Sequence, residues 1–308
     1  MPEVRRRTRL SPMAAQERRD FWLFLSPWII GFVLFSFGPI LASFAMSFTD
    51  YSIFKSPRWI GLGNYREMLF EDPLILKALW NTFFYTFFAV PLHTVASLAV
   101  ALLLNKKVKG LPVWRTFFYL PCVVSGIAMG VLWRWIFNPE IGLANTILGP
   151  FLDILRLPHP QWLLDPVLAK PAYVLMNLWS LGGGMIIFLA GLQGVPDHLY
   201  EAADIDGAGR WAQFRHVTLP MITPVIFFQL TMGLIGSFQI FSQAYVMSGR
   251  GIDNSTLFYV YYLFEQAFRY FRMGYASAMA WVLFAGILAV TVLKFKLAKR
   301  WVYYEGAE

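Results

Sequence analysis

Charged residues are scarce in this sequence of 308 residues, of which only 14% are Asp, Glu, Lys or Arg. An average soluble domain carries about 25%. Hydrophobic residues make up 57% of the chain, which argues against an ordinary soluble domain and predicts a protein embedded in a membrane.

Cysteine is almost absent too. Cys122 is the only one and lies in an apolar run, which excludes an intrachain disulfide and a cysteine metal site, so we interpret it as a small packing residue.

Motifs that carry chemistry are also missing. The sequence contains no G-x-x-x-x-G-K-[ST] phosphate loop, so this chain is not expected to hydrolyse ATP, and it contains no H-E-x-x-H motif. Its histidines, His93, His159, His198 and His216, lack the spacing of metal ligands. We therefore expect no catalytic residue, no metal site and no cofactor bound by this chain. Nearly all acids lie in tails and loops, which argues against a proton relay through the bilayer.

The sequence does contain apolar runs long enough to cross a bilayer, which requires about 20 residues. Six such runs cover residues 21–48, 78–104, 117–137, 172–192, 222–247 and 275–293. The predicted fold is therefore an all-α integral membrane protein with six transmembrane helices. The first run is longer than the apolar part of a signal peptide and lacks a convincing cleavage site, so we expect no cleavable signal.

Basic residues indicate the orientation of the spans. The net charge is +8, but Lys and Arg gather at the ends of the apolar runs and form no continuous face, so we expect no nucleic-acid partner. One side of the bundle holds 16 of the 26 Lys and Arg residues, in segments 1–20, 105–115, 194–224 and 294–308. The richer side should be cytoplasmic, with both termini. The expected outer segments are 50–77, 138–170 with one or two short helices, and the loop 248–273.

Segment 194–224 is a long charged stretch, compatible with helices, between two apolar runs. Asp197 is a plausible N-cap, a helix follows over 198–206, and Gly207-Ala208-Gly209 breaks it. Helical character then resumes until Leu219-Pro220 stops it. Two short helices joined at a glycine, projecting from a bilayer, form a knob that another protein can bind. The alternative is an interfacial helical hairpin without a partner.

Three parts of this segment, Glu201-Ala202-Ala203, Gly207 and Val217-Thr218-Leu219-Pro220, resemble the EAA loop of ABC importer permeases. In that pattern E-A-A is followed by three residues, a glycine, nine residues and I/V-x-L-P. The resemblance implies a type I ABC importer permease, whose loop is a cytoplasmic coupling helix that docks in a cleft of an ATPase subunit.

The same resemblance assigns ATPase coupling to Glu201, Ala202, Ala203, Asp206, Gly207, Leu219 and Pro220. The glutamate would pair with a basic residue of the ATPase, the two alanines would pack in its cleft, and the glycine would permit the turn. The Leu-Pro pair would set the point at which the loop becomes a membrane helix. For Asp204 and Asp206 a solvated position is the favoured interpretation. Glu201 also suits a helix start, where an acid interacts favourably with the helix dipole.

A second resemblance concerns the solute. Segments 59–73 (WIGLGNYREMLFEDP), 117–145 (FFYLPCVVSGIAMGVLWRWIFNPEIGLAN) and 300–306 (RWVYYEG) resemble carbohydrate-uptake permeases related to those for maltose, lactose and glycerol 3-phosphate. This implies a subunit of an ATP-driven sugar or oligosaccharide importer in the inner or plasma membrane, of the first-subunit type. The implied partners are a second homologous permease, a dimer of ABC ATPases that holds the ATP and Mg²⁺, and an extracytoplasmic solute-binding protein. The expected organisation is tail 1–20, first helix and outer interfacial segment 21–77, permease domain 78–297 and tail 298–308.

A translocated sugar needs amides, hydroxyls and aromatic rings along a water-filled path. Candidates in the fourth and fifth runs are Asn177, Trp179, Ser180, Gln239, Ser242, Gln243 and Tyr245. Gln239, Ser242 and Gln243 have i, i+3, i+4 spacing, which predicts one face of a helix. The glycines at 182–184 indicate close helix approach or local unwinding. The alternative for these side chains is ordinary hydrogen bonding between helices, with the tryptophan at an interface.

Sugar import has three alternatives: another solute, a membrane-embedded enzyme, and a scaffold or receptor. The solute could be glycerol phosphate, phosphate or a polyamine, but a phosphate would favour cationic groups in the path, which the fourth and fifth runs lack. A membrane-embedded lipid-modifying enzyme would need clustered acids or histidines at one membrane face. A scaffold or receptor would leave segment 194–224 without an ATPase to bind. His93 is interpreted as a packing or backbone-binding residue, and Arg134, between two tryptophans, as an interfacial anchor.

Overall fold

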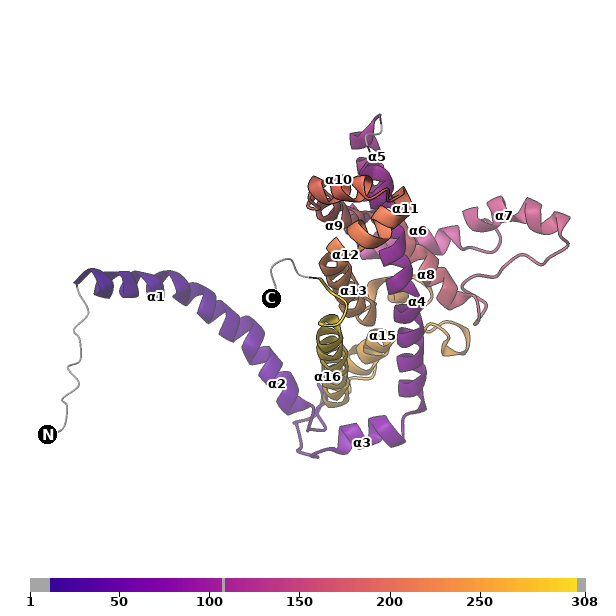
Figure 1. The fold of residues 1–308 in the computed structure, drawn as a ribbon. Coiled ribbons are helices and arrows are strands. Elements are labelled where there is room, and N and C mark those ends of the chain that lie inside the picture. Colours follow the sequence, from indigo (N-terminus) through magenta and orange to yellow (C-terminus); the bar gives the residue numbers. More distant parts are fainter. Residues whose placement is uncertain (1–11, 107–108, 304–308) are drawn as a thin grey trace.

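The computed structural model describes residues 12–106 and 109–303, and within them the regular structure is helical. By length and composition, three helices can cross a membrane: Gln16–Met46, Pro73–Leu104 and Met273–Ala298. Up to six spans are present if each of three bent helix pairs counts as one (Figure 1). The predicted all-α membrane fold is confirmed, with the difference that several of its spans are broken.

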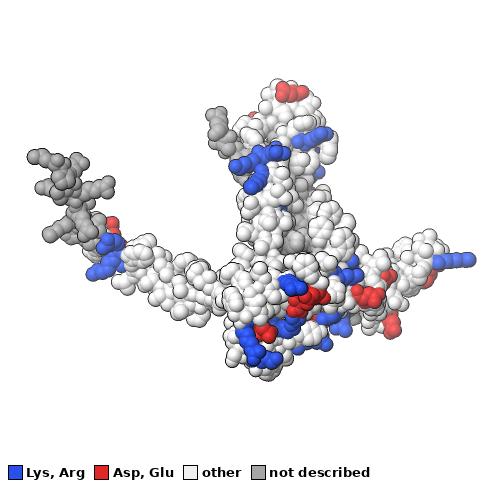
Figure 2. Space-filling model, turned by 90° about the horizontal axis from the view of Figure 1, so that it is seen from below, with Lys and Arg blue, Asp and Glu red and all other residues white. Residues whose placement is uncertain are grey.

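The first span stands apart from the rest of the molecule. It consists of α1 (Pro12–Phe32), a π-helical turn η1 (Val33–Phe37) and α2 (Gly38–Met46). The helix therefore begins inside the expected tail, at a proline, which suits a first helical turn. No described side chain between residues 16 and 46 is buried, and the surface of the helix beyond its charged end is uncharged (Figure 2). Its contact with the bundle is through α2, where Trp281 Nε1 donates to Ser43 Oγ over 3.2 Å.

The second span is the central helix. α3 (Gly63–Phe70) leads to α4 (Pro73–Leu104), and Asp72 joins them. Asp72 Oδ1 accepts a hydrogen bond from the backbone N–H of Leu74 over 2.9 Å, and this caps α4. α4 packs against α8, α9 and α13, which are described below, and one of its faces is buried along its whole length.

Three spans are broken rather than continuous. Their parts are α5 (Leu111–Tyr119), η2 (Leu120–Val123) and α6 (Gly126–Ile136); α8 (Ala169–Trp179) and α9 (Gly182–Gln193); and the run Arg210–Met221, which ends in α12 (Leu219–Met221), with α13 (Thr223–Phe238). The bends are 99°, 49° and 63° in that order. The spans predicted over 117–137 and 172–192 are therefore bent helix pairs, and the second bend lies at the glycine run where local unwinding was one of the two expectations. A local cause at the first bend is Ser125, whose Oγ accepts from the Ala128 N–H over 3.3 Å and starts a new helix there.

The remaining elements also refine the expected spans. α7 (Leu143–Ile154) is a short helix within the predicted outer segment 138–170. The predicted fifth helix ends at Phe238, and α14 (Ser242–Met247) follows after a break. The sixth, α16 (Met273–Ala298), contains Lys294, which was expected at a membrane edge. Its Nζ donates to Thr231 Oγ1 of α13 over 3.2 Å.

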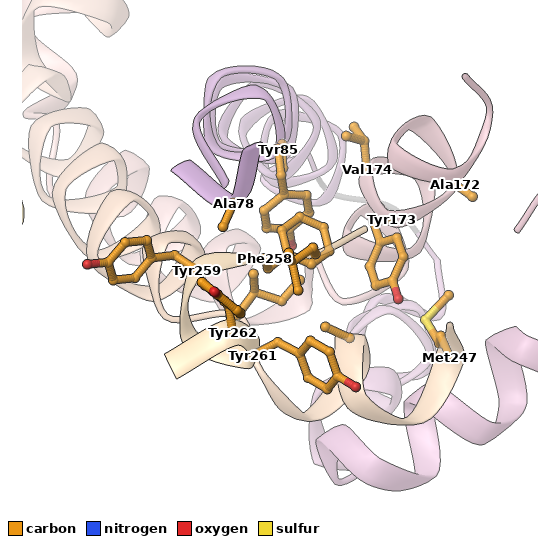
Figure 3. Packing of buried hydrophobic residues seen from close by; sticks show 14 of the residues in the cluster. Ala78, Tyr85, Ala172, Tyr173, Val174, Met247, Phe258, Tyr259, Tyr261 and Tyr262 are labelled. Carbon is orange, nitrogen blue, oxygen red and sulfur yellow. The ribbon is translucent and has the colours of Figure 1, made fainter. Parts of the chain in front are cut away.

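Segment 248–273, predicted as an outer loop, is the main correction to the fold. Leu257, Phe258 and Tyr259 are fully buried, and α15 (Tyr259–Phe264) with a π-helical turn η5 (Glu265–Arg269) folds into the bundle. In Figure 3 the Phe258 ring lies between Tyr85 of α4 and Tyr173 of α8, with ring centroids 5.7 and 5.1 Å away. The segment is rich in aromatic residues, and their burial stabilises it inside the bundle.

Side chains of α4 satisfy the backbone of this buried segment. Asn81 Nδ2 donates to the carbonyl oxygens of Asn254 and Leu257 over 2.8 and 3.1 Å, and Thr82 Oγ1 accepts from the Tyr259 N–H over 2.9 Å. Both side chains are fully buried. The segment therefore enters the bundle without leaving these backbone groups unpaired, which would be costly away from water.

Charged groups hold the α3 end of the bundle together. Asp72 Oδ2 accepts hydrogen bonds from the hydroxyls of Tyr262 and Tyr275, each over 2.7 Å, and Arg272 pairs with Glu67. Asp72 thus ties the start of α4 to α15 and α16.

Replacing this carboxylate should destabilise the protein. Asp72→Asn keeps an oxygen that can cap α4. The amide NH₂ that takes the place of Oδ2 is a donor and cannot accept a hydrogen bond from either tyrosine. Hydrogen bonds to charged groups contribute about 1.5–3 kcal/mol each, so we expect the free energy of unfolding in detergent to fall by about 2–4 kcal/mol. The control is Glu71→Gln, because Glu71 is 61% exposed and its 3.9 Å pair with Arg66 lies at the surface. It should change stability by less than about 0.5 kcal/mol, and an equal effect of both variants would contradict the role of Asp72.

Candidate functional site

A polar cavity of about 450 Å³ lies inside the helical bundle. Its lining comes from α4, α8, α13 and the break before α14: Tyr85, Ala89, Val90, His93, Thr94, Asn177, Gln229, Gly233, Gly236, Ser237, Gln239, Ile240 and Gln243. These residues supply amides, hydroxyls, an imidazole and one aromatic ring, and none carries a permanent charge. Such a lining can exchange hydrogen bonds with a polar, uncharged solute.

Three of the residues predicted for a path line this cavity. They are Asn177, Gln239 and Gln243, and the Asn177 Nδ2 donates to the Tyr85 hydroxyl over 3.2 Å. The prediction that Gln239, Ser242 and Gln243 share one face of a continuous helix is wrong, because α13 ends at Phe238 and α14 begins at Ser242. The break nevertheless leaves both glutamines in the cavity wall.

The other four predicted residues lie outside the lining. Trp179 packs on the hydrophobic core with its ring 6.1 Å from that of Trp133, and Tyr245 stacks near Phe241 and is 55% exposed. Ser242 lies against Gly126, on α6. Ser180 stands at the break between α8 and α9, where its carbonyl oxygen accepts from Cys122 Sγ over 3.2 Å and lies 3.3 Å from His93 Nε2.

Several lining residues were missed, although a periodic signal marks them. Tyr85, Ala89 and His93 follow each other at intervals of four in α4, and Gln229, Gly233 and Ser237 do so in α13. Small and polar residues at this spacing define one face of a helix. His93 does contact a backbone carbonyl, as interpreted from the sequence, and it also lines the cavity.

Glycines allow the helices around the cavity to approach closely. A Cβ on Gly182 would overlap the carbonyl oxygen of Phe118, and one on Gly184 would lie 2.6 Å from Gln229 Nε2 and 2.7 Å from Ser97 Oγ. The glycine run at 182–184 therefore marks both of the features expected of it, a close approach and a break in the helix.

The charged segment 194–224 forms a projecting loop at the upper end of Figure 1. It contains α10 (Asp197–Ile205), α11 (Arg210–Gln213) and a π-helical turn η3 (Phe214–Thr218). Asp197 is the first residue of α10 and not its cap, which is Pro196 without a side-chain bond. Leu219-Pro220 do not stop the helix, since the 63° bend comes just after them, between Met221 and Thr223.

Polar contacts make this loop one rigid unit. Gly207 has a φ of +74°, which a residue with a side chain rarely adopts, and this sets the turn between α10 and α11. Gln213 Nε2 of α11 donates to Asp204 of α10 and, over 3.1 Å, to the carbonyl oxygen of Ala208. The Tyr200 and Thr218 hydroxyls share a hydrogen bond of 2.9 Å. Asp204 is exposed, as expected, and it also accepts this hydrogen bond from Gln213.

The tip of the loop exposes both acids and apolar side chains. Glu201, Ala202, Asp206 and Gly207 are exposed, and Ala203, Leu219 and Pro220 are partly buried. Two large apolar side chains flank the turn, Ile205 at 87% exposure and Trp211 at 72%. The base of the loop packs into a second hydrophobic cluster, which contains Met185, Phe188, Leu192, Val195 and Ile222. A rigid knob with exposed apolar groups is typical of a protein interaction site.

An apolar bundle that encloses an uncharged polar cavity is the architecture of a multi-pass membrane protein that handles polar solutes. Residues 73–302 match the family model of the binding-protein-dependent transport system inner membrane component. The match covers well over half of the chain, which therefore belongs to this family of transport components.

Individual relatives agree with the family. The probable ABC transporter permease protein YesP of Bacillus subtilis (strain 168) is 42% identical over 291 residues, 93% of each chain. The arabinooligosaccharides transport system permease protein AraP of the same organism is 37% identical over 281 residues, 90% of this chain and 88% of the relative. In a crystal structure of a bacterial alginate ABC transporter in complex with an alginate pentasaccharide-bound periplasmic protein, one chain superposes with a TM-score of 0.81 at 23% identity, over 94% of this chain and 98% of that chain. That likeness establishes the fold.

The close approach at Gly182 can be tested by substitution. Gly182→Ala should lower the melting temperature of the purified protein in detergent, because the new methyl group forces α9 away from the end of α5, and overpacking costs about 1–3 kcal/mol. Gly183→Ala is the matched control, since nothing lies within 4 Å of a Cβ there. It should leave the melting temperature unchanged or raise it slightly. Equal melting temperatures for both variants would refute the close approach.

Proposed function

We propose that this chain is one permease subunit of an ATP-driven, binding-protein-dependent importer of sugars or oligosaccharides, and that it forms half of the translocation path. It lies in the cell membrane with both termini in the cytoplasm. One observation carries the proposal: α13 begins at the projecting loop and continues to the cavity, where Gln229 and Ser237 line the wall. A force applied to the loop therefore reaches the cavity through a single helix.

The energy source in this proposal is a partner. A dimer of ABC ATPases would hold the ATP and Mg²⁺ and would grip the loop. Glu201 is available to a basic residue of the ATPase, Ala202 and Ala203 permit close packing, and Ile205 and Trp211 add apolar contact area. Closure of the ATPase changes these contacts, and the loop responds by the difference in contact free energy between the two states.

The chemistry of the cavity supports an uncharged sugar as the solute. Asn177, Gln239 and Gln243 can each pair with hydroxyls, and the Tyr85 ring offers a face to sugar C–H groups. A phosphate such as glycerol 3-phosphate would favour a cationic residue, and the lining contains none. The naming of the relative AraP for arabinooligosaccharides agrees with this class of solute. Membership of a transport family favours import over the membrane-embedded enzyme.

Two further partners complete the proposed importer. A second, homologous permease would supply the other half of the path and lie near the first span, whose described side chains between residues 16 and 46 are all unburied. An extracytoplasmic solute-binding protein would deliver the sugar at the end that carries α3. With this orientation, the projecting loop lies in the cytoplasm.

Coupling can be tested at the turn of the loop. Gly207→Val should separate ATP hydrolysis from uptake, because valine strongly disfavours a φ of +74° and the substitution would reorient α10 against α11. Gly209→Val is the matched control, since its φ is −69° and nothing lies within 4 Å of a Cβ there. In the reconstituted complex we expect Gly207→Val and Glu201→Ala to reduce sugar uptake about tenfold or more with normal membrane insertion. Parental uptake and ATPase stimulation in both variants would rule out this role of the loop.

The path is tested separately at the cavity wall. Gln239→Ala and Gln243→Ala should each raise the sugar concentration that gives half-maximal uptake, because a lost hydrogen bond to an uncharged partner is worth about 0.5–1.5 kcal/mol. This loss of free energy corresponds to an increase in the half-maximal sugar concentration of roughly twofold to tenfold. Gln161→Ala, at an exposed glutamine outside the cavity, serves as the control. Radiolabelled sugar uptake measures the effect, and attachment of the ATPase should not change. Unaltered uptake kinetics would remove both glutamines from the path.

A further inference from the structure

A second cavity, of about 480 Å³, opens between the segments that follow α6 and α14. Both segments were assigned to the side of the membrane opposite the projecting loop. Its lining consists of Arg134, Phe137, Asn138, Pro139, Leu163, Leu164, Met247, Ser248, Arg250, Gly251 and Ile252. Charged side chains gather at this end of the molecule, as Figure 2 shows from the side that carries α3.

The cavity combines an apolar floor with a cationic rim. Phe137, Leu163 and Met247 are at most 8% exposed and form the floor. Arg134 and Arg250 are the charged residues of the lining. Glu140, Asp165 and Asp253 lie next to lining residues in the chain but do not line the cavity. The walls therefore present two guanidinium groups and no carboxylate.

The two arginines differ in what already binds them. Arg250 is held in place, since its Nε donates to Glu265 Oε2 over 2.8 Å and its Nη2 to the Tyr270 hydroxyl over 3.1 Å. Glu265 is shared with Arg269, 3.0 Å away, so one carboxylate serves two cations. Arg134 is exposed and makes a backbone bond of 3.4 Å to Val246, and it forms no ion pair within the described part of the chain.

We propose that this arginine-rimmed cavity receives an acidic side chain of the extracytoplasmic binding protein. The inference rests on the proposed function and names the chemistry of one of its contacts. A guanidinium pairs well with a carboxylate, because two parallel N–H···O bonds join them and both groups are charged. A protein carboxylate is favoured over an acidic sugar because the central cavity has no cation to receive such a sugar next.

The position of α14 connects this docking contact to the path. Its Gln243 lines the central cavity and its Met247 lines the outer one. α14 also packs tightly on α6, where a Cβ on Gly130 would lie 3.1 Å from Val246 Cβ. An acidic side chain seated against Arg134 and Arg250 therefore contacts the α6–α14 pair, and through it acts on Gln243.

Charge reversal at the free arginine tests the proposal. The complex is reconstituted in nanodiscs and titrated with the solute-binding protein that supports its sugar uptake, while sugar-stimulated ATP hydrolysis is measured. We expect Arg134→Glu to raise the half-saturating concentration of binding protein about tenfold. Raising NaCl from 50 to 300 mM should weaken the parental interaction and affect the variant much less, because rim charges act through salt-dependent association.

The controls separate the possible sources of an effect. Arg156→Glu, at an arginine beyond the end of α7 and outside the cavity, should behave like the parent. A parental half-saturation value for Arg134→Glu would overturn the docking site. A change confined to the apparent affinity for sugar, at saturating binding protein, would assign the arginine to the solute and also overturn it. If the parental complex is not stimulated by the binding protein at all, it is the proposed function that fails.

Discussion

Backbone groups within a bilayer have no water to bind, and this constraint governs every break in the helices of this protein. At several breaks a polar side chain binds a backbone group that has no helical partner. Asn81 and Thr82 bind the backbone at both ends of the buried turn before α15. Ser97 Oγ donates to the carbonyl oxygen of Leu181 over 3.0 Å, and Cys122 Sγ accepts from the Gly183 N–H over 3.2 Å at the break between α8 and α9. The cysteine is thus more than the small packing residue expected from the sequence.

These breaks allow polar groups to meet inside an apolar bundle. In a continuous fifth helix, Gln239 and Gln243 would lie on the same helix face, one turn apart. The helix breaks between α13 and α14, and both glutamines line the cavity together with Asn177 and His93. The cavity that results lies between two separate hydrophobic clusters. One surrounds α15, and the other surrounds the base of the projecting loop. Each end of the bundle has its own packed core, with the polar residues between them.

The fold class could be predicted from the sequence, because a long apolar run indicates a helix whose surface can face lipid. The sequence also located the projecting loop, where the motif from Glu201 to Pro220 coincides with a charged stretch. It did not locate the buried segment before α15, because Asp253, Glu265 and Arg269 resemble the residues of an exposed loop. In the structure Glu265 is buried and binds two arginines. Arg269 lies four residues along the chain, whereas Arg250 lies 15 residues before Glu265, and no local pattern reveals that second pair. The cavity was predicted only in part. Tyr85 and His93 were missed because they lie within a long apolar run, although their spacing of four residues with Ala89 marks one face of α4.

The detached first span has a consequence for how the molecule is made. No described side chain between residues 16 and 46 is buried, and the contacts of this helix with its own chain are confined to the α2 end, where Ser43 and Phe44 meet Trp281 of α16. This helix can therefore insert into lipid before its angle to the bundle is set. That angle is set when another surface packs against the helix. A cell that makes this chain in excess would accumulate inserted molecules whose first span has no packing partner. Quality-control proteases that recognise unpacked membrane helices could identify such molecules as incompletely assembled.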